Sequence, residues 1–161
     1  MVNLKENLSK IIAKLSDSNK TISTMESCTG GALASLITDV SGASAVFKYG
    51  AVTYSNEYKI KMGVSSEVID KYSVYSMETA REMAMSISKF TSSDYGIGIT
   101  GKLGEGDPNN LSGDNNRVFI CIYDKESDKY IDLDTYVNSS NRVDDKKEVL
   151  EFIVSKLDLY V

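Results

Sequence analysis

One short segment concentrates the side chains that could act as nucleophiles. Residues 26–31 have the sequence ESCTGG, which places Ser27, Cys28 and Thr29 between a β-branched stretch and an apolar helical one. The first amides of a helix have no partner within it, so a strand-to-helix turn of this kind can stabilise an oxyanion or hold a phosphate. The alternative is structural: Ser27 or Thr29 caps the helix, and Gly30 and Gly31 permit tight packing.

The chain contains no histidine, which limits the bases available to a nucleophile. A Ser-His-Asp triad, a Cys-His dyad and an imidazole metal site are therefore excluded. Lys59 is the best remaining base for Ser27, provided that desolvation or a neighbouring cation lowers its pKa from about 10.4 to about 7–8. A solvated helix lysine is the alternative interpretation. Tyr54 could bridge Ser27 and Lys59, donate to a substrate, or simply pack.

The cysteines favour neither a metal site nor a disulfide scaffold. Cys28 and Cys121 are far apart in the chain and form no CxxC pair, which fits a reducing cytoplasm. Cys28 is a second candidate nucleophile because a helix terminus favours a thiolate, with a half-buried structural cysteine as the alternative. The Asp- and Asn-rich stretch 107–116 lacks the calcium-loop pattern, so we expect no metal.

Length and charge narrow the class of protein. A chain of 161 residues predicts a single domain over 1–161 with its own core. Eighteen basic against 23 acidic residues give a net charge of −5, which disfavours nucleic acid binding. No apolar run approaches the roughly 18 residues of a membrane span. We therefore expect a cytoplasmic protein that binds neither nucleic acid nor membrane.

Hydrophobic periodicity predicts helices alternating with five strands. Ser76 is the expected N-cap of the clearest helix, and its apolar stripe ends at Phe90. The predicted helices cover 4–15, 32–37, 56–62, 66–72, 77–92 and 142–159, and the predicted strands cover 21–25, 45–54, 95–100, 118–123 and 130–137. A long Gly- and Asn-rich loop spans 103–116, a length that is usually functional or disordered.

This alternation predicts a three-layer α/β/α domain with a mixed five-stranded sheet. Helical crossovers join the first three strands, which should therefore run parallel and end at one edge of the sheet, although their order stays open. Ser27, Lys59 and the Thr100–Gly101 segment follow these strand ends. Open α/β sheets generally bind their ligands at such an edge.

Three segments together resemble the CinA C-terminal domain family. They are ESCTGG at 26–31, TDVSGASAVF at 38–47 and YSNEYK at 54–59, and the similarity continues through Gly63-Val64, the Ser76 helix and Thr100-Gly101. The resemblance implies a compact α/β/α fold and a stand-alone version of this domain. It also implies nicotinamide-nucleotide amidase activity, which converts nicotinamide mononucleotide to nicotinate mononucleotide and ammonia.

The resemblance further implies roles for single residues. Ser27 becomes the nucleophile and Lys59 its base, while Tyr54, Thr100 and Gly101 line the pocket. The turn at Cys28, Thr29, Gly30 and Gly31 faces the substrate, and Arg142 holds its phosphate or makes a dimer contact. A homodimer that needs no cofactor or metal is the corresponding expectation.

One pocket wall departs from the family pattern. Family members usually continue after Thr-Gly with Ile-Ala-Gly-Pro and later with Lys-Pro-Val-Gly, whereas this chain has KLGEGDP at 102–108 and NNRV at 115–118. Two other functions therefore stay open. One is a non-catalytic nucleotide-binding module, and the other is a scaffold associated with competence or DNA repair.

Overall fold

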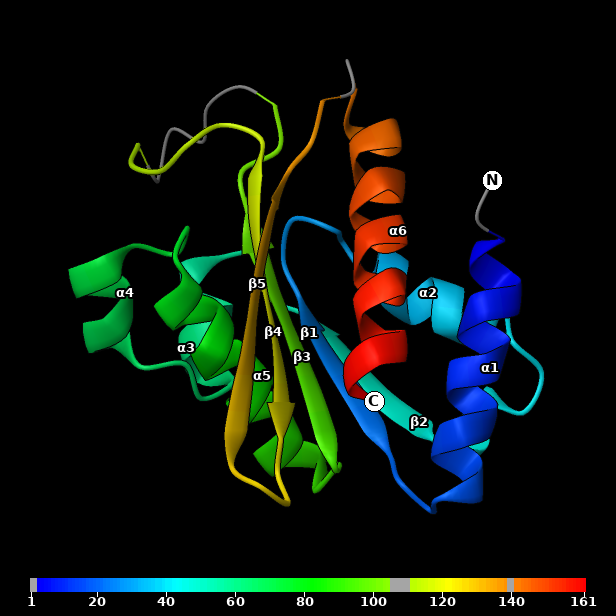
Figure 1. Ribbon diagram of the computed structural model, residues 1–161. Coiled ribbons are helices and arrows are strands. Elements are labelled where there is room, and N and C mark those ends of the chain that lie inside the picture. Colours follow the sequence, from blue (N-terminus) through cyan, green and yellow to red (C-terminus); the bar gives the residue numbers. More distant parts are fainter. Residues whose placement is uncertain (1–2, 105–110, 139–140) are drawn as a thin grey trace.

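The computed structural model describes residues 3–104, 111–138 and 141–161 (Figure 1). In chain order its elements are α1 (Leu4–Asp17), β1 (Ile22–Glu26), α2 (Ala32–Thr38), the 3-10 turn η1 (Ala43–Ala45), β2 (Phe47–Val52), α3 (Asn56–Lys61), α4 (Ser66–Tyr72), α5 (Met77–Thr91), β3 (Tyr95–Gly101), β4 (Arg117–Asp124), β5 (Lys129–Tyr136) and α6 (Arg142–Tyr160). The second strand is shorter than predicted, because residues 43–45 form η1 and β2 begins only at Phe47. Of the predicted long loop, residues 105–110 lie outside the described residues.

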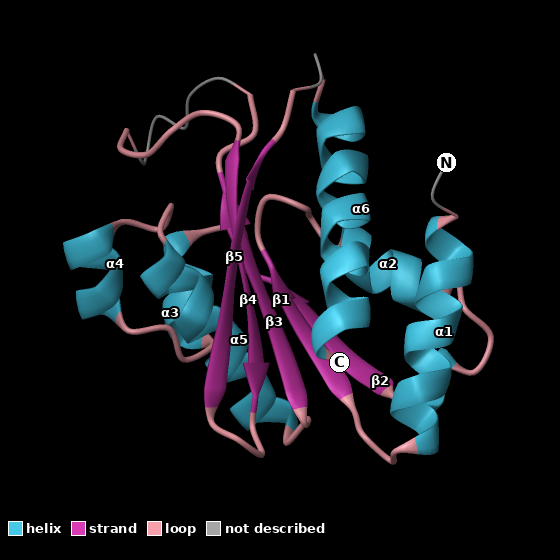
Figure 2. Cartoon of the chain, in the orientation of Figure 1, coloured by secondary structure: helices cyan, strands magenta, loops and turns pink. Residues whose placement is uncertain are grey.

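The five strands form one mixed sheet in the order β2-β1-β3-β4-β5. Strand β1 pairs in parallel with β2 and with β3, whereas β4 and β5 continue the sheet antiparallel. Helices α1, α2 and α6 cover one face, and α3, α4 and α5 cover the other (Figures 1 and 2). The predicted three-layer α/β/α architecture is confirmed. The sheet order also places the carboxyl end of β1, and hence Ser27, between those of β2 and β3.

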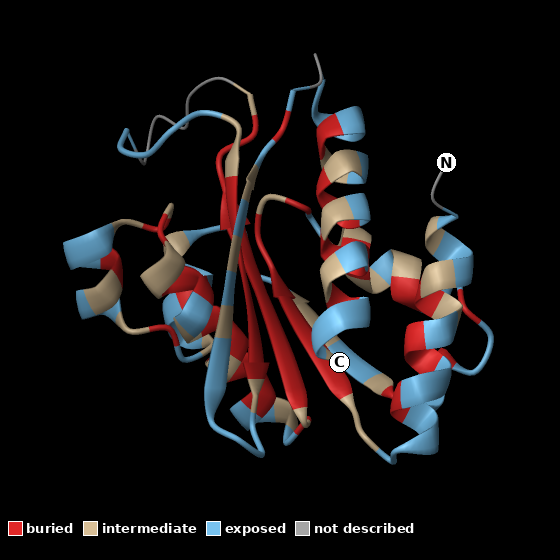
Figure 3. Ribbon diagram, in the orientation of Figure 1, coloured by how far each residue is buried: buried red, intermediate tan, exposed pale blue. Residues whose placement is uncertain are grey.

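The core lies on both faces of the three central strands, whose residues are buried almost throughout (Figure 3). Strand β5 forms one edge of the sheet, and its side chains alternate: Ile131 and Leu133 pack on the core while Asp132 and Asp134 are exposed. Polar side chains facing solvent suit an edge strand. Among the described helices, none combines the length and apolar character needed to cross a membrane.

Glycines in β3 let α5 approach the sheet closely. A Cβ at Gly96 would lie 2.0 Å from the Ala84 carbonyl oxygen, and one at Gly98 would lie 2.3 Å from that of Ala80. The missing side chains of these two glycines therefore make room for the helix.

The predicted apolar stripe of α5 is correct except at its end. Ala80, Met83, Ala84 and Ile87 are fully buried, but Phe90 is 64% exposed. Its ring lies 5.4 Å from that of Tyr49, itself exposed on the edge strand β2. The last turn of α5 therefore packs beside the sheet edge instead of beneath it, so helical spacing alone did not decide the burial of Phe90.

Candidate active site

Ser27 and Lys59 meet at the carboxyl edge of the sheet. Ser27 directly follows β1, and its amide donates to the Ile99 carbonyl of neighbouring β3, which fixes the start of the turn. Lys59 lies on α3, which begins at its N-cap Ser55 just after β2. The Lys59 Nζ atom is 2.9 Å from the Ser27 Oγ atom. Two segments 32 residues apart thus place an amine and a hydroxyl in direct contact.

The Lys59 amine is buried and oriented. The side chain is 2% exposed, and Nζ also donates to the Thr53 carbonyl oxygen at 2.7 Å. Nζ thus donates both to the Ser27 hydroxyl and to the Thr53 carbonyl. To act as the base of Ser27, the amine would have to be neutral and accept the proton of this hydroxyl. The solvated-lysine alternative for Lys59 is therefore wrong.

The turn after Ser27 is held by a residue that the sequence analysis did not single out. Glu26 is 1% exposed, and its carboxylate accepts hydrogen bonds from Thr29 Oγ1 at 2.6 Å, from the Leu33 amide at 3.0 Å and from the Ala34 amide at 2.9 Å. Helix α2 has Gly31 at its N-cap and no side-chain cap there. Glu26 supplies the missing acceptor from the preceding strand, since early helix amides need partners.

Because Glu26 accepts hydrogen bonds from helix amides, those amides are not available to a substrate. The amides of Leu33 and Ala34 bind Glu26, and those of Gly30 and Ala32 donate to carbonyls within the turn. By contrast, the amides of Cys28, Thr29 and Gly31 have no backbone acceptor among the described residues. An oxyanion beside Ser27 would therefore be stabilised by the turn at 28–31 and not by the first turn of α2.

Cys28 is poorly suited to be the nucleophile. Its side chain packs against the hydrophobic core, and burial raises the pKa of the Cys28 thiol to about 12. A thiol with that pKa is ionised in only about one molecule in ten thousand at pH 8. The geometry therefore favours the hydroxyl of Ser27.

We expect the Cys28→Ala variant to keep at least about one third of the native catalytic rate. Residue 28 contributes its backbone amide to the turn, and this amide stays when the thiol is removed. In the native protein, neither Cys28 nor Cys121 should react with iodoacetamide at pH 8, since burial raises both thiol pKa values to about 12. Mass spectrometry of the alkylated protein, with a urea-unfolded sample as the positive control, checks this. Rapid labelling of folded Cys28 together with loss of activity would instead identify a thiol nucleophile.

Tyr54 and Arg142 lie together on the outer side of the site. Tyr54 is 65% exposed in the loop after β2, and the Arg142 guanidinium donates to its hydroxyl at 3.4 Å from the start of α6. Because Lys59 contacts Ser27 directly, Tyr54 is not needed as a bridge between them. The predicted contact of Tyr54 and Arg142 with substrate stays a prediction.

Thr100 and Gly101 lie at the end of β3, as the topology predicted, but both are engaged with the protein. Thr100 is buried, and its hydroxyl donates to the Val74 carbonyl at 2.8 Å. A Cβ at Gly101 would lie 2.6 Å from the Arg117 carbonyl oxygen, so glycine permits the close pairing of β3 with β4. Their predicted contact with substrate stays a prediction.

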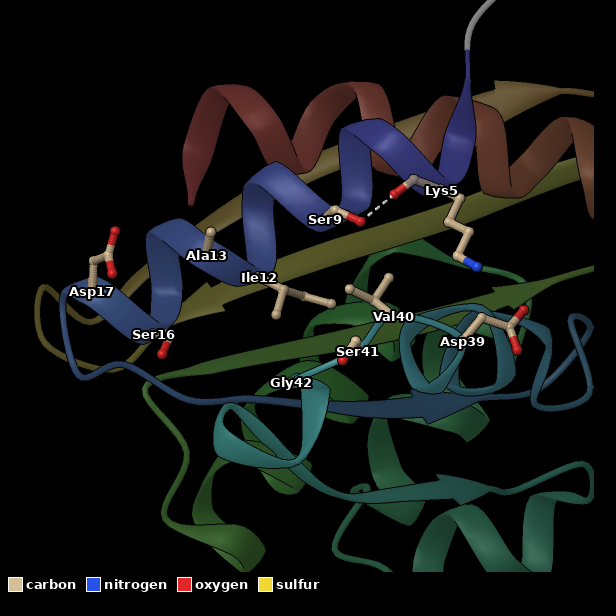
Figure 4. A pocket seen from close by; sticks show the side chains of 10 residues that line it. All are labelled: Lys5, Ser9, Ile12, Ala13, Ser16, Asp17, Asp39, Val40, Ser41 and Gly42. Atoms are coloured by element: carbon tan, nitrogen blue, oxygen red, sulfur yellow. Dashed lines mark hydrogen bonds between the residues drawn. The ribbon is translucent and has the colours of Figure 1, made fainter.

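Apart from Ser27 and Lys59, the structure has a pocket but no cluster of metal ligands in the described part of the chain. A pocket of about 500 Å³ opens between α1 and the turn at 39–42, and none of the predicted site residues lines it (Figure 4). Among the described residues, no three Asp, Glu or Cys side chains are grouped so that they could hold a metal ion. The residues that come together with a defined chemical geometry are those around Ser27.

Comparison with known proteins places this arrangement in a family. The model of the CinA C-terminal domain matches residues 5–157, which is nearly the whole chain. The chain belongs to the CinA C-terminal domain family. The resemblance in its three motifs is thereby confirmed.

Relatives and solved structures agree with this membership. A putative competence-damage inducible protein of Thermoanaerobacter sp. (strain X514) is 46% identical over 62% of this chain, and one of Clostridium beijerinckii is 44% identical over 73%. These alignments span only 24% and 29% of the two relatives. A competence or damage-inducible protein of Enterobacter asburiae matches in structure with a TM-score of 0.91 over 99% of both chains, at 24% identity. That structural likeness supports the CinA fold.

Proposed function

We propose that this CinA domain hydrolyses the carboxamide of a pyridine nucleotide, converting nicotinamide mononucleotide to nicotinate mononucleotide and ammonia. The observation that carries the proposal is the 2.9 Å contact between Lys59 Nζ and Ser27 Oγ in a buried position. A hydroxyl held against an amine is a nucleophile with its base, and acyl transfer is the chemistry that such a pair performs. The identity of the amide rests on the family resemblance.

In the first half of the reaction, Lys59 takes the proton of Ser27 Oγ as this oxygen attacks the carboxamide carbon. The new C–O bond produces a tetrahedral oxyanion, which the free amides of the turn at 28–31 would stabilise. The intermediate collapses when its C–N bond breaks. Lys59 then returns the proton to the departing nitrogen, which leaves as ammonia.

The second half regenerates the enzyme. Lys59 takes a proton from water, and the resulting hydroxide attacks the ester carbon of the acylated Ser27. The ester C–O bond breaks, Ser27 recovers its proton from Lys59, and the product leaves as the carboxylic acid, which loses its proton to water or to the released ammonia. Lys59 carries the proton in each bond-making and bond-breaking step, and no step changes an oxidation state.

Ammonia release over a panel of amides tests this proposal. The panel contains nicotinamide mononucleotide, nicotinamide riboside, nicotinamide and glutamine, and coupled detection reports the ammonia. We expect turnover of nicotinamide mononucleotide well above that of the other three. Calorimetric binding of this nucleotide without ammonia release would favour a nucleotide-binding module instead. If no amide is bound or hydrolysed, a scaffold role is favoured, which matches the competence-damage names of the relatives.

The expected setting is the cytoplasm, and the expected assembly is a homodimer in which Arg142 holds phosphate or contacts the second copy. Sedimentation velocity distinguishes these two roles. Phosphate binding by Arg142 predicts that the Arg142→Ala variant sediments like the native protein, whereas a dimer contact predicts dissociation.

A further inference from the structure

Two buried threonine hydroxyls have no hydrogen-bond partner among the residues that the structure describes. They are Thr24 Oγ1 in β1 and Thr53 Oγ1 just after β2. Burying a hydroxyl without a partner costs folding free energy, because its hydrogen bonds to water are lost. Native structures contain few such groups, and some of them serve the chemistry of a site. Of these two threonines, Thr53 is the one that contacts the Lys59 amine.

Thr53 lies against Lys59 from the end of β2. It is 2% exposed, and its carbonyl oxygen accepts the hydrogen bond from Lys59 Nζ at 2.7 Å. Its amide donates to the Glu26 carbonyl at 2.8 Å, so the backbone is still paired with β1 at this position. Ala51, two residues earlier, packs on the α5 side of the sheet, which α3 also covers (Figure 1). Because side chains alternate along a strand, the Thr53 side chain faces the same side, where Lys59 lies.

The chemistry proposed for Ser27 and Lys59 creates a charge beside Thr53. When Lys59 takes the Ser27 proton, its neutral amine becomes an ammonium at a site that is closed to bulk water. A buried charge of this kind needs hydrogen-bond acceptors from the protein. A threonine hydroxyl has two lone pairs and a rotatable O–H bond, so its oxygen can turn toward a cation while its proton turns away.

We propose that Thr53 is a positioning residue for Ser27 and Lys59: its carbonyl oxygen orients the Lys59 amine, and its hydroxyl accepts an N–H of the ammonium formed during proton transfer. The inference rests on the Ser-Lys chemistry of the proposed function but not on the identity of the amide. A partner that is gained only in the charged state accounts for a hydroxyl that is otherwise unpaired. Such a contact is stronger in the transition state than in the ground state, and it therefore raises kcat.

The Thr53→Val variant tests this role with a side chain of nearly the same shape. With nicotinamide mononucleotide, we expect kcat to fall about tenfold, the scale of a lost hydrogen bond to a charged group. The KM value should stay within about twofold, since the bound ground state contains no ammonium at Lys59. Thr53→Ser keeps the hydroxyl and should retain at least about one third of the native kcat.

Thr24→Val is the matched control, because it removes the other unpaired hydroxyl. Thr24 Oγ1 lies 2.5 Å from the position of a Cβ on Gly50, and this position is also 3.5 Å from Ala34 of α2, on the sheet face opposite Lys59. Its kcat should stay within about twofold of the native value. Both valine variants should unfold at a urea concentration no lower than the native protein, since each loses a hydroxyl that had no partner. A lower kcat in Thr53→Val would then not reflect unfolding.

Fluorophosphonate labelling of Ser27 separates this inference from the amidase proposal. In this reaction Ser27 Oγ forms a P–O bond and displaces fluoride, while Lys59 takes the hydroxyl proton, so no amide is involved. We expect Thr53→Val to be labelled about tenfold more slowly than the native protein and Thr24→Val. That result supports the inference even if no amide is hydrolysed. Three results would overturn it: labelling of Thr53→Val within twofold of the native rate, equal losses in both valine variants, or a native Ser27 that is not labelled.

Discussion

Replacing Lys59 by methionine should lower the rate of ammonia release by about 10³-fold, the scale of losing a general base. Methionine is close to lysine in length and is apolar, so it fills the buried position without offering a proton acceptor. Ser27 would then keep its proton during attack on the carboxamide. Initial rates at saturating nicotinamide mononucleotide measure the effect.

The control for this variant is Lys61→Met, on the same short helix. Lys61 is largely exposed, pairs with Glu57 at 3.0 Å and lies over the exposed ring of Tyr58, so its loss removes only surface contacts. Its rate should remain within about twofold of the native rate. Far-UV circular dichroism of both variants reports whether α3 and its surroundings remain folded. Near-native turnover in a folded Lys59→Met protein would remove Lys59 from the chemistry.

The Glu26→Ala variant should lose about 3–5 kcal/mol of unfolding free energy, because a buried acceptor disappears and leaves its donors unsatisfied. Those donors are the Thr29 hydroxyl and the amides of Leu33 and Ala34. Activity should fall as well, since the same bonds hold the turn that follows Ser27. Urea unfolding followed by circular dichroism measures the stability.

Two further variants make the Glu26 result specific. Glu26→Gln keeps one oxygen acceptor but turns an NH₂ group toward a donor, so it should destabilise less than Glu26→Ala but more than a surface change. Glu57→Ala removes an exposed carboxylate and should cost less than about 0.5 kcal/mol. Equal stability of Glu26→Ala and Glu57→Ala would show that the buried carboxylate does not hold the turn.

The contact between Ser27 and Lys59 could be predicted from the sequence because each residue has a local signal. Ser27 lies on a strand-to-helix turn, Lys59 follows the next strand end, and the absence of histidine removes the usual competitor. Parallel crossovers then bring the two segments to one edge. The order of the strands could not be predicted from the sequence, because the connection between β2 and β3 is long enough to place β3 on either side of β1.

Glu26 was missed for a different reason, since two of its three donors are backbone amides, which no side-chain pattern records. A signal for Glu26 existed nonetheless. Helix α2 begins at Ala32, and its N-cap Gly31 has no side chain that could accept a hydrogen bond, so the early amides of the helix required an acceptor from elsewhere.

A double-mutant cycle on ammonia release tests most directly whether Ser27 and Lys59 work as one unit. The cycle compares the native protein with Ser27→Ala, Lys59→Met and the double variant, each confirmed as folded. We predict that each single variant loses about 10³-fold in kcat and that the double variant loses no more than the worse single one. If the losses of the two single variants multiply in the double variant, or if Ser27→Ala retains activity within tenfold, the shared proton transfer does not occur.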